Sequence, residues 1–242
     1  MKLFFLALQF LTRLPTKNYA EVSELEIGKS VLFYPLVGLL IGTILVAIEQ
    51  GGSFLSSSIL AIIILVISVL ISGALHLDGL ADTADGWLSG GDKEKTLSVM
   101  KDPHLGTAGV VSVVLVLLAK YVILIEVVEQ ESWLVLLLAP VFARSLPLFF
   151  FLKLSYVSVG GIAQDMILHL PKKTAWVLLL LILITSLGFF PFETILTLVI
   201  LFLFYRMVKK CQGGYTGDTL GAVIELSELF FLLFFVVITS LS

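Results

Sequence analysis

The chain has 242 residues, of which 59% are hydrophobic and only 14% are charged. Soluble domains are about 45–50% apolar and about 25% charged, so this composition excludes an ordinary soluble protein. The net charge of −3 says little, because in a membrane protein the distribution of charge along the chain decides orientation. The one cysteine, Cys211, excludes an internal disulfide and a thiolate metal cage. We expect no nucleic-acid partner.

The apolar residues form long runs, and a run of about 18 or more with few charges is typical of a transmembrane helix. Residues 2–13 are too short to span and end before Pro15, so they predict a short interfacial helix. Residues 14–30 are polar and predict a lead-in to the first span. We predict spans at 31–49, 55–75, 107–128, 133–152, 174–190, 192–209 and 222–241.

The fold class is therefore all-α. We expect a polytopic integral membrane bundle of about seven helices, preceded by the short interfacial helix, in a single domain covering residues 1–242. The loops near 50–54, 129–132 and 190–194 contain no Lys or Arg, whereas the segments on the other side carry many. The positive-inside rule then places the N-terminus and long loops in the cytoplasm. We expect a multi-pass protein of the cytoplasmic (inner) membrane, surrounded by the lipid bilayer; whether it forms a homo-oligomer stays open.

The stretch 76–109 concentrates aspartates in an otherwise apolar chain, beginning where the second span ends. Asp78, Asp82 and Asp85 have the spacing i, i+4, i+7. On one helix they would lie at roughly 0°, 40° and −20°, in one narrow stripe. Because like charges this close repel, the stripe predicts a cation among them. Mg²⁺, as one ion or a pair, is the expected cation, since it prefers carboxylate oxygens completed by water and substrate phosphate.

Four other polar residues give no indication of a catalytic or metal-binding role. Asp92 precedes two lysines in the segment SGGDKEK and predicts a helix cap. His76 would lie about 160° from the stripe on a continuous helix, so we expect a structural role for it. Asp165 and His169, in the loop 153–173, have a spacing typical of a solvated loop.

The segment before the third span predicts a phosphate contact. Lys101 could neutralise diphosphate charge, and Asp102 could add a metal ligand or position the lysine. Gly106 permits a tight turn, and the free amides at the start of the third span could meet phosphate. An ordinary loop with a helix cap explains these residues equally well.

A second glycine-rich stretch, 213–228, also leads into a predicted helix. Gly217 and Gly221 would let the backbone approach a ligand, and Asp218 adds a carboxylate. A glycine-rich loop is by itself a weak signal, and this one lacks the spacing of a nucleotide-binding P-loop.

Charged residues inside predicted spans need partners or a wet cavity. Glu225 and Glu228 fall within the last span, and Arg144 lies near the middle of the fourth. We expect Arg144 to pair with an acid such as Glu228 or to bind a substrate anion. Lys120, in the third span, is expected to be structural, with its amine reaching toward the interface.

The chain resembles the cobalamin synthase family, the adenosylcobinamide-GDP ribazoletransferases, in three motifs and in its opening residues: HLDGLADTADG, MKDPHLGTAG, GGYTGDTLGA and ALQFLTRLP. The resemblance covers most of the chain in order. It implies a Mg²⁺-dependent enzyme, a transferase of substituted phosphate groups. The implied reaction joins adenosylcobinamide-GDP to α-ribazole, or to its 5′-phosphate, and releases GMP.

The resemblance also implies site residues. Asp78, Asp82 and Asp85 match the family's acidic motif and would hold the metal, with Asp82 and Asp85 as catalytic candidates. The implied substrate-binding residues are Lys101, Asp102, Gly106, Arg144, Gly217, Asp218 and Glu228. Leu77 stands where the family has an acid and His104 where it has Arg, so neither receives a role.

The expected mechanism is attack of a ribazole hydroxyl on the phosphorus of the cobinamide arm. One aspartate, for which Asp85 is a candidate, would take the proton; the sequence does not choose among them. Two alternatives stay open. A CDP-alcohol phosphatidyltransferase-like lipid synthase also places aspartates at the membrane edge, but its motif has Ala-Arg soon after Asp-Gly, whereas here Leu80-Ala81-Asp82 follows. A cation-coupled transporter would use the acids as an ion site.

Overall fold

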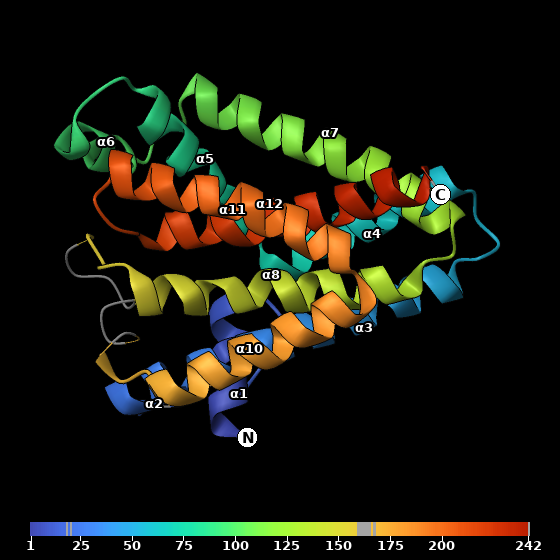
Figure 1. The fold of residues 1–242 in the computed structure, drawn as a ribbon, viewed down its shortest axis with the longest axis horizontal. Helices are drawn as coiled ribbons and strands as arrows, with labels where there is room; N and C mark the ends of the chain where they lie inside the picture. Colours follow the sequence, from blue (N-terminus) through green and yellow to red (C-terminus); the bar gives the residue numbers. More distant parts are fainter. Residues whose placement is uncertain (18, 20, 159–165, 167, 242) are drawn as a thin grey trace.

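The computed structural model describes residues 1–17, 19, 21–158, 166 and 168–241. Asp165 lies outside the described residues. The described part is helical apart from turns, loops and one isolated β-bridge between Tyr156 and Tyr215. Its long helices run side by side in one elongated bundle (Figure 1). This confirms the predicted all-α polytopic membrane fold.

Most helices of the described chain follow one another with short connections, the exceptions being those between α1 and α2 and between α8 and α10. In the described residues a 3₁₀ turn, Val31–Phe33, joins α2 to α3. Their bounds are α1 (Lys2–Leu11), α2 (Glu24–Ser30), α3 (Tyr34–Gly51), α4 (Ser57–Ser72), α5 (Leu75–Leu88), α6 (Lys93–Val99), α7 (Thr107–Glu129), α8 (Trp133–Lys153), α10 (Lys172–Phe189), α11 (Pro191–Cys211) and α12 (Gly217–Thr239). In this part of the chain six helical segments are long and apolar enough to span a membrane, or seven if α4 and α5 count together.

The start of the first span was predicted wrongly. Residues 14–30 are not a polar lead-in throughout, because Glu24–Ser30 is helical and continues into α3. Ser23 starts this helix with a capping box: its hydroxyl accepts the amide N–H of Glu26, whose carboxylate accepts the Ser23 amide N–H. Such a box satisfies two of the free amides at a helix start, which lets the helix begin before the apolar run.

The end of the second span was also predicted wrongly. The helix does not continue from residue 55 through residue 75 into the aspartates; α4 ends at Ser72, and α5 leaves at 84° to it. The break consists of Gly73 and Ala74, both left-handed with φ of 61° and 60°. A left-handed glycine is a common helix stop, and the second left-handed residue redirects the chain. The aspartate stripe therefore has a helix of its own.

Small residues set the closest helix contacts. Gly38 and Gly42, one turn apart on α3, face α8; a Cβ at either would strike the carbonyl oxygen of Pro140 or Leu137. This is the G-x-x-x-G spacing that allows two membrane helices to approach closely.

The ends of the helices that carry chemistry gather at one end of the bundle. Figure 1 shows α5, α6 and the starts of α7, α10 and α12 at its left, together with the last turns of α8 and α11. The short connections after α3 and α7 lie at the opposite end. We call the left-hand end the aspartate end, because Asp78, Asp82, Asp85 and Asp218 lie there.

Gly73→Ala tests the break between α4 and α5. A side chain at a left-handed position costs about 1–2 kcal/mol, and this Cβ would also meet the Arg13 side chain. We expect the apparent melting temperature in detergent to fall by about 2–4 °C per kcal/mol lost. Gly51→Ala is the control, because a Cβ there meets nothing within 4 Å. Equal melting temperatures of the two variants would contradict this account of the break.

Candidate active site

The aspartate stripe lies on α5, with Asp78 exposed and Asp82 half-buried. Gly79, between them, packs directly on the start of α12: a Cβ there would lie 2.6 Å from the carbonyl oxygen of Asp218. A Cβ on Gly221, one turn further along α12, would lie 3.2 Å from the Cα of His76. The two helices therefore run antiparallel in close contact, which puts Asp218 beside the stripe.

The start of α12 is fixed by a second capping box. The hydroxyl of Thr216 accepts the amide N–H of Thr219 at 3.2 Å, and that of Thr219 accepts the Thr216 amide N–H at 3.3 Å. The Thr216 hydroxyl also lies 3.3 Å from Asp218 Oδ2, to which it donates. Just before this helix, the amide of Gln212 is satisfied when its oxygen faces Trp87; in that orientation it accepts a hydrogen bond from Trp87 Nε1 at 2.7 Å, which ties the loop to the end of α5.

Asp85 has a different environment from the other two stripe residues. Its carboxylate accepts the amide N–H groups of Gly106 and Gly109, both at 2.8 Å. These amides belong to the first turn of α7, where backbone donors lack partners within the helix. A Cβ on either glycine would strike this carboxylate. The amides predicted to meet phosphate are thus bound to Asp85, which joins α5 to α7.

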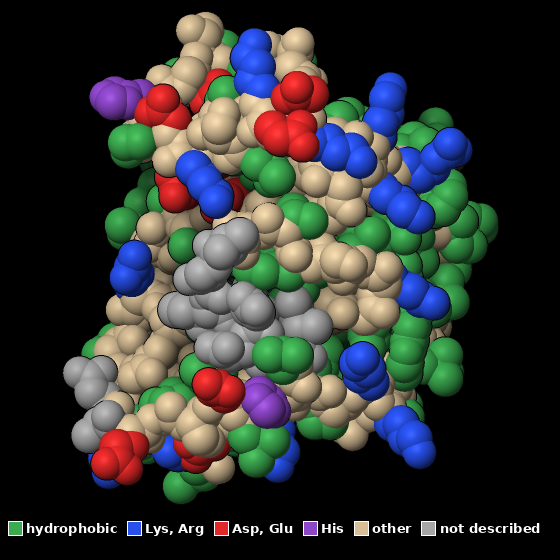
Figure 2. All heavy atoms as spheres, turned by 90° about the vertical axis from the view of Figure 1, so that its left-hand side faces the viewer, with side chains coloured by type: hydrophobic (Ala, Val, Ile, Leu, Met, Phe, Trp, Pro, Cys, Tyr) green, Lys and Arg blue, Asp and Glu red, His purple; other side chains and the backbone are tan. Residues whose placement is uncertain are grey.

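The aspartates repel one another, since the negative charges of Asp218, Asp78 and Asp85 all act on the Asp82 carboxylate. In the described part of the chain no ion pair neutralises any of these four residues. Figure 2 looks onto the aspartate end and shows acidic side chains close together in its upper part. As the described side chains lie, no group of three acids, histidines or cysteines encloses a metal ion. The four carboxylates form an open group that a cation bound to a ligand could complete.

The segment between α5 and α7 contains one confirmed prediction and one missed residue. Asp92 caps α6, accepting the Lys95 amide N–H at 2.9 Å, as the sequence predicted. Lys93 was missed: its Nζ would lie 3.5 Å from a Cβ on Gly213, so its charge sits beside the glycine-rich loop. Its place after a helix cap gave no signal of this contact, which joins segments far apart in the chain.

Lys101 and Asp102 are both exposed. Asp102 accepts hydrogen bonds from the backbone amide of His104 at 2.9 Å and from its ring at 2.7 Å, which lower the pKa of the aspartate carboxyl. Asp102 is therefore ionised at neutral pH. We call Asp78, Asp82, Asp85 and Asp218 the aspartate cluster. Within the described residues, no hydrogen bond or ion pair joins Lys101 or Asp102 to this cluster.

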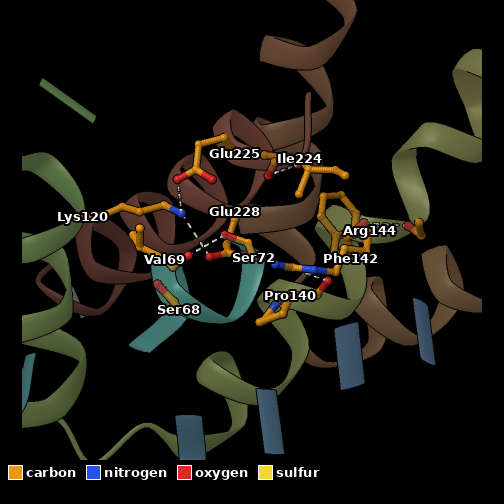
Figure 3. Close-up of polar contacts among 12 residues, drawn as sticks. Ser68, Val69, Ser72, Lys120, Pro140, Phe142, Arg144, Ile224, Glu225 and Glu228 are labelled. Atoms are coloured by element: carbon orange, nitrogen blue, oxygen red, sulfur yellow. Dashed lines mark hydrogen bonds and ion pairs between the residues drawn. The ribbon is translucent and has the colours of Figure 1, made fainter. Parts of the chain in front are cut away.

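A buried ion-pair network lies deeper in the bundle (Figure 3). Lys120 Nζ is 2.6 Å from Glu225 Oε1 and 3.0 Å from Glu228 Oε1, and Arg144 Nη1 is 2.7 Å from Glu228 Oε2. All four residues are at most 8% exposed. The predicted pairing of Arg144 with Glu228 is confirmed. The burial of Lys120 was not predicted, nor was its pairing with Glu225.

The network joins α7, α8 and α12 and contains two cations and two anions. Its charges balance, which is the condition for keeping ions inside a membrane bundle. The burial of Arg144 and Glu228 is thus explained by their mutual pairing, without a substrate. His76 is also buried, and its Nε2 has no hydrogen-bond partner in the described part of the chain.

Lys120→Met tests the network. Among the described residues Glu225 pairs with Lys120 alone, so the variant leaves a buried unpaired carboxylate, which we expect to cost about 3–5 kcal/mol. Adding Glu225→Leu removes both charges of the pair and leaves Arg144 with Glu228, so the double variant should recover most of the loss. Unfolding in detergent measures both. A single variant as stable as the parent protein would contradict the role of this pair.

The fold and this site define a polytopic membrane protein with a carboxylate-rich candidate active site at one end of its bundle. A family model described as Cobalamin-5-phosphate synthase matches residues 3–236. The chain belongs to this family and is a transferase of cobalamin biosynthesis. No solved structure matches it.

Curated relatives match along nearly their whole length. A protein of Pseudomonas fluorescens (strain Pf0-1) named adenosylcobinamide-GDP ribazoletransferase is 44% identical over 230 residues, covering 93% of this chain and 94% of the relative. A protein of the same name from Acinetobacter baumannii (strain ATCC 17978) is 40% identical over 238 residues, covering 97% and 96%. A third, from Pseudomonas putida (strain W619), is 45% identical over 232 residues, covering 93% and 95%.

Proposed function

We propose that this protein joins adenosylcobinamide-GDP to α-ribazole, or to its 5′-phosphate, and releases GMP. The proposed substrates, adenosylcobinamide-GDP and ribazole, are those that the names of the relatives give. The main support for the site is the contact of Gly79 with Asp218, which brings the carboxylates of α5 and α12 together. No lysine or arginine of the described residues forms an ion pair with them. Such a group of carboxylates suits a diphosphate that arrives with a divalent metal ion.

Magnesium is the cofactor that these residues fit best. Mg²⁺ is usually held by one or two carboxylates, with waters and substrate phosphates completing its shell. An open group of aspartates therefore fits it, although no closed cage exists among the described residues. Asp78, Asp82 and Asp218 are the proposed ligands. When bound, the ion supplies positive charge to the diphosphate and stabilises the leaving phosphate.

Asp82 is the proposed general base, because both oxygens of Asp85 already accept backbone hydrogen bonds. The ribazole hydroxyl gives its proton to the Asp82 carboxylate as its oxygen forms a bond to the phosphorus on the cobinamide arm. The bond from that phosphorus to the GMP oxygen breaks, and GMP leaves with the electron pair. Asp85 is a positioning residue, which holds the start of α7 against α5.

The aspartate end is proposed to face the cytoplasm of the inner membrane. Exposed lysines and arginines gather at this end, on α8, α10 and α11, and such residues favour the cytoplasmic side. Nucleotide substrates would then reach the site directly. Lys93, beside the glycine-rich loop, and Lys101 are the nearest candidates to contact substrate phosphate.

Asp82→Asn should reduce GMP release from adenosylcobinamide-GDP and α-ribazole by about 100-fold or more, because it removes both the base and a metal ligand. The matched control is Asp92→Asn, since asparagine also caps helices well and Asp92 lies outside the cluster. Both purified variants should keep the parent melting temperature. Near-normal turnover in Asp82→Asn would contradict the proposed role.

Asp218→Asn and Asp85→Asn should separate ligand from positioning roles. Asp218→Asn removes a proposed ligand, so we expect a higher Mg²⁺ concentration for half-maximal activity. Asp85→Asn turns an amide N–H₂ toward one of the α7 amides, so we expect a lower melting temperature and an unchanged Mg²⁺ requirement. The Mg²⁺ dependence of GMP release and thermal unfolding measure these effects. The reverse pattern would exchange the two roles.

The same assay discriminates against the alternatives. A lipid synthase would release CMP from a CDP-activated lipid donor, and a transporter would move cations across vesicles without any nucleotide. CMP release or nucleotide-independent flux, without GMP release, would overturn the proposal.

A further inference from the structure

A large apolar cleft lies away from the aspartates, between α8, α10 and α11. Its volume is about 590 Å³, within the range of about 300–1,000 Å³ typical of ligand sites. Its walls are mostly aliphatic and aromatic, including Phe149, Trp176, Leu183 and Phe202. Along each of the three helices the lining residues extend from the part nearest the aspartate end to the middle of the helix or just past it.

The cleft exists because α10 packs loosely on the bundle. Only Ala175 and Ser186 of this helix are buried. On the opposite wall, the small side chain of Ser145 leaves space between the larger residues of α8. Protein side chains do not fill this volume, and in a bilayer the surrounding molecules are lipids.

Among the described residues that line the cleft, Lys153, the last residue of α8, is the one that carries a charge. Its Nζ lies 5.1 Å from the centre of the Trp176 ring, and no acid of the described chain pairs with it. Figure 2 shows lysine and arginine side chains along the right-hand edge of this end. The exposed bases at the ends of α10 and α11 here are Lys172, Lys173, Arg206, Lys209 and Lys210.

We propose that this cleft is a binding site for an anionic phospholipid. One acyl chain occupies the apolar volume, and the phosphate pairs with Lys153 at its mouth. Lys153 selects an anionic headgroup, as basic residues in pockets between membrane helices do. The apolar walls exclude a free phosphate or nucleotide as the occupant. This site is independent of the proposed reaction.

The test is native mass spectrometry of the purified full chain with equal amounts of phosphatidylglycerol and phosphatidylcholine carrying the same acyl chains. We expect the first bound lipid to be phosphatidylglycerol, with about five-fold preference, the effect of one lysine near an anionic lipid. Lys153→Gln should abolish the preference. Leu183→Trp, which fills the cleft, should reduce binding of this first lipid several-fold.

Two controls match these variants. Lys29→Gln removes an exposed lysine of α2 at the same end, and Leu181→Trp adds a tryptophan to an exposed position of α10 outside the cleft. Both should keep the preference and the binding. Equal binding of the two lipids to the parent protein would overturn the proposal. So would an unchanged preference in Lys153→Gln together with unchanged binding in Leu183→Trp.

Discussion

The close contact between α5 and α12 is the constraint on which the candidate site depends. It is possible only because Gly79 and Gly221 lack side chains at the crossing. Without it, the carboxylate of Asp218 would lie on a helix apart from α5, and the stripe on α5 would have no partner. The same contact places the buried His76 beside Gly221. The two glycines thus allow α12 to hold Asp218 beside the aspartates of α5.

The two charged regions of the bundle differ in their balance. The buried network of Lys120, Arg144, Glu225 and Glu228 contains equal numbers of cations and anions, and it ties α12 to α7 and α8. It needs no ligand and gives α12 a fixed place. At the aspartate end, by contrast, no ion pair of the described residues neutralises Asp78, Asp82, Asp85 or Asp218. A rigid element that carries an uncompensated charge to a surface is the arrangement expected of a binding site for a cation and its ligand.

The sequence predicted most of the long helices well, because hydrophobic runs such as 107–128 and 133–152 directly reflect the thickness of a membrane. It also placed Asp78, Asp82 and Asp85 on one helix through their spacing. The sequence-based prediction was wrong where tertiary contacts determine the path of the chain. A left-handed Ala74 cannot be read from composition, so the break before α5 was missed.

The roles of individual side chains show the same limit. Spacing could not reveal that Asp85 binds amides of Gly106 and Gly109, since those donors lie more than twenty residues away. The pairing of Arg144 with Glu228 was predictable because few acids lie within spans. The partner of Lys120 was not, because nothing in the sequence indicates that α7 and α12 touch at that point. The family motifs indicated the type of reaction. They did not show that, in the described part of the chain, Asp85 binds backbone amides whereas Asp78 and Asp82 do not.

The most direct test of the central claim is a pulsed electron paramagnetic resonance measurement with Mn²⁺ in place of Mg²⁺. The protein is mixed with Mn²⁺ and adenosylcobinamide-GDP, and hyperfine coupling between the ion and phosphorus is recorded. Because the aspartate cluster is proposed to hold the metal against the diphosphate, the account predicts a protein-dependent ³¹P coupling that is lost when the cluster is neutralised. A coupling identical to that of Mn²⁺ with the substrate in free solution would contradict it.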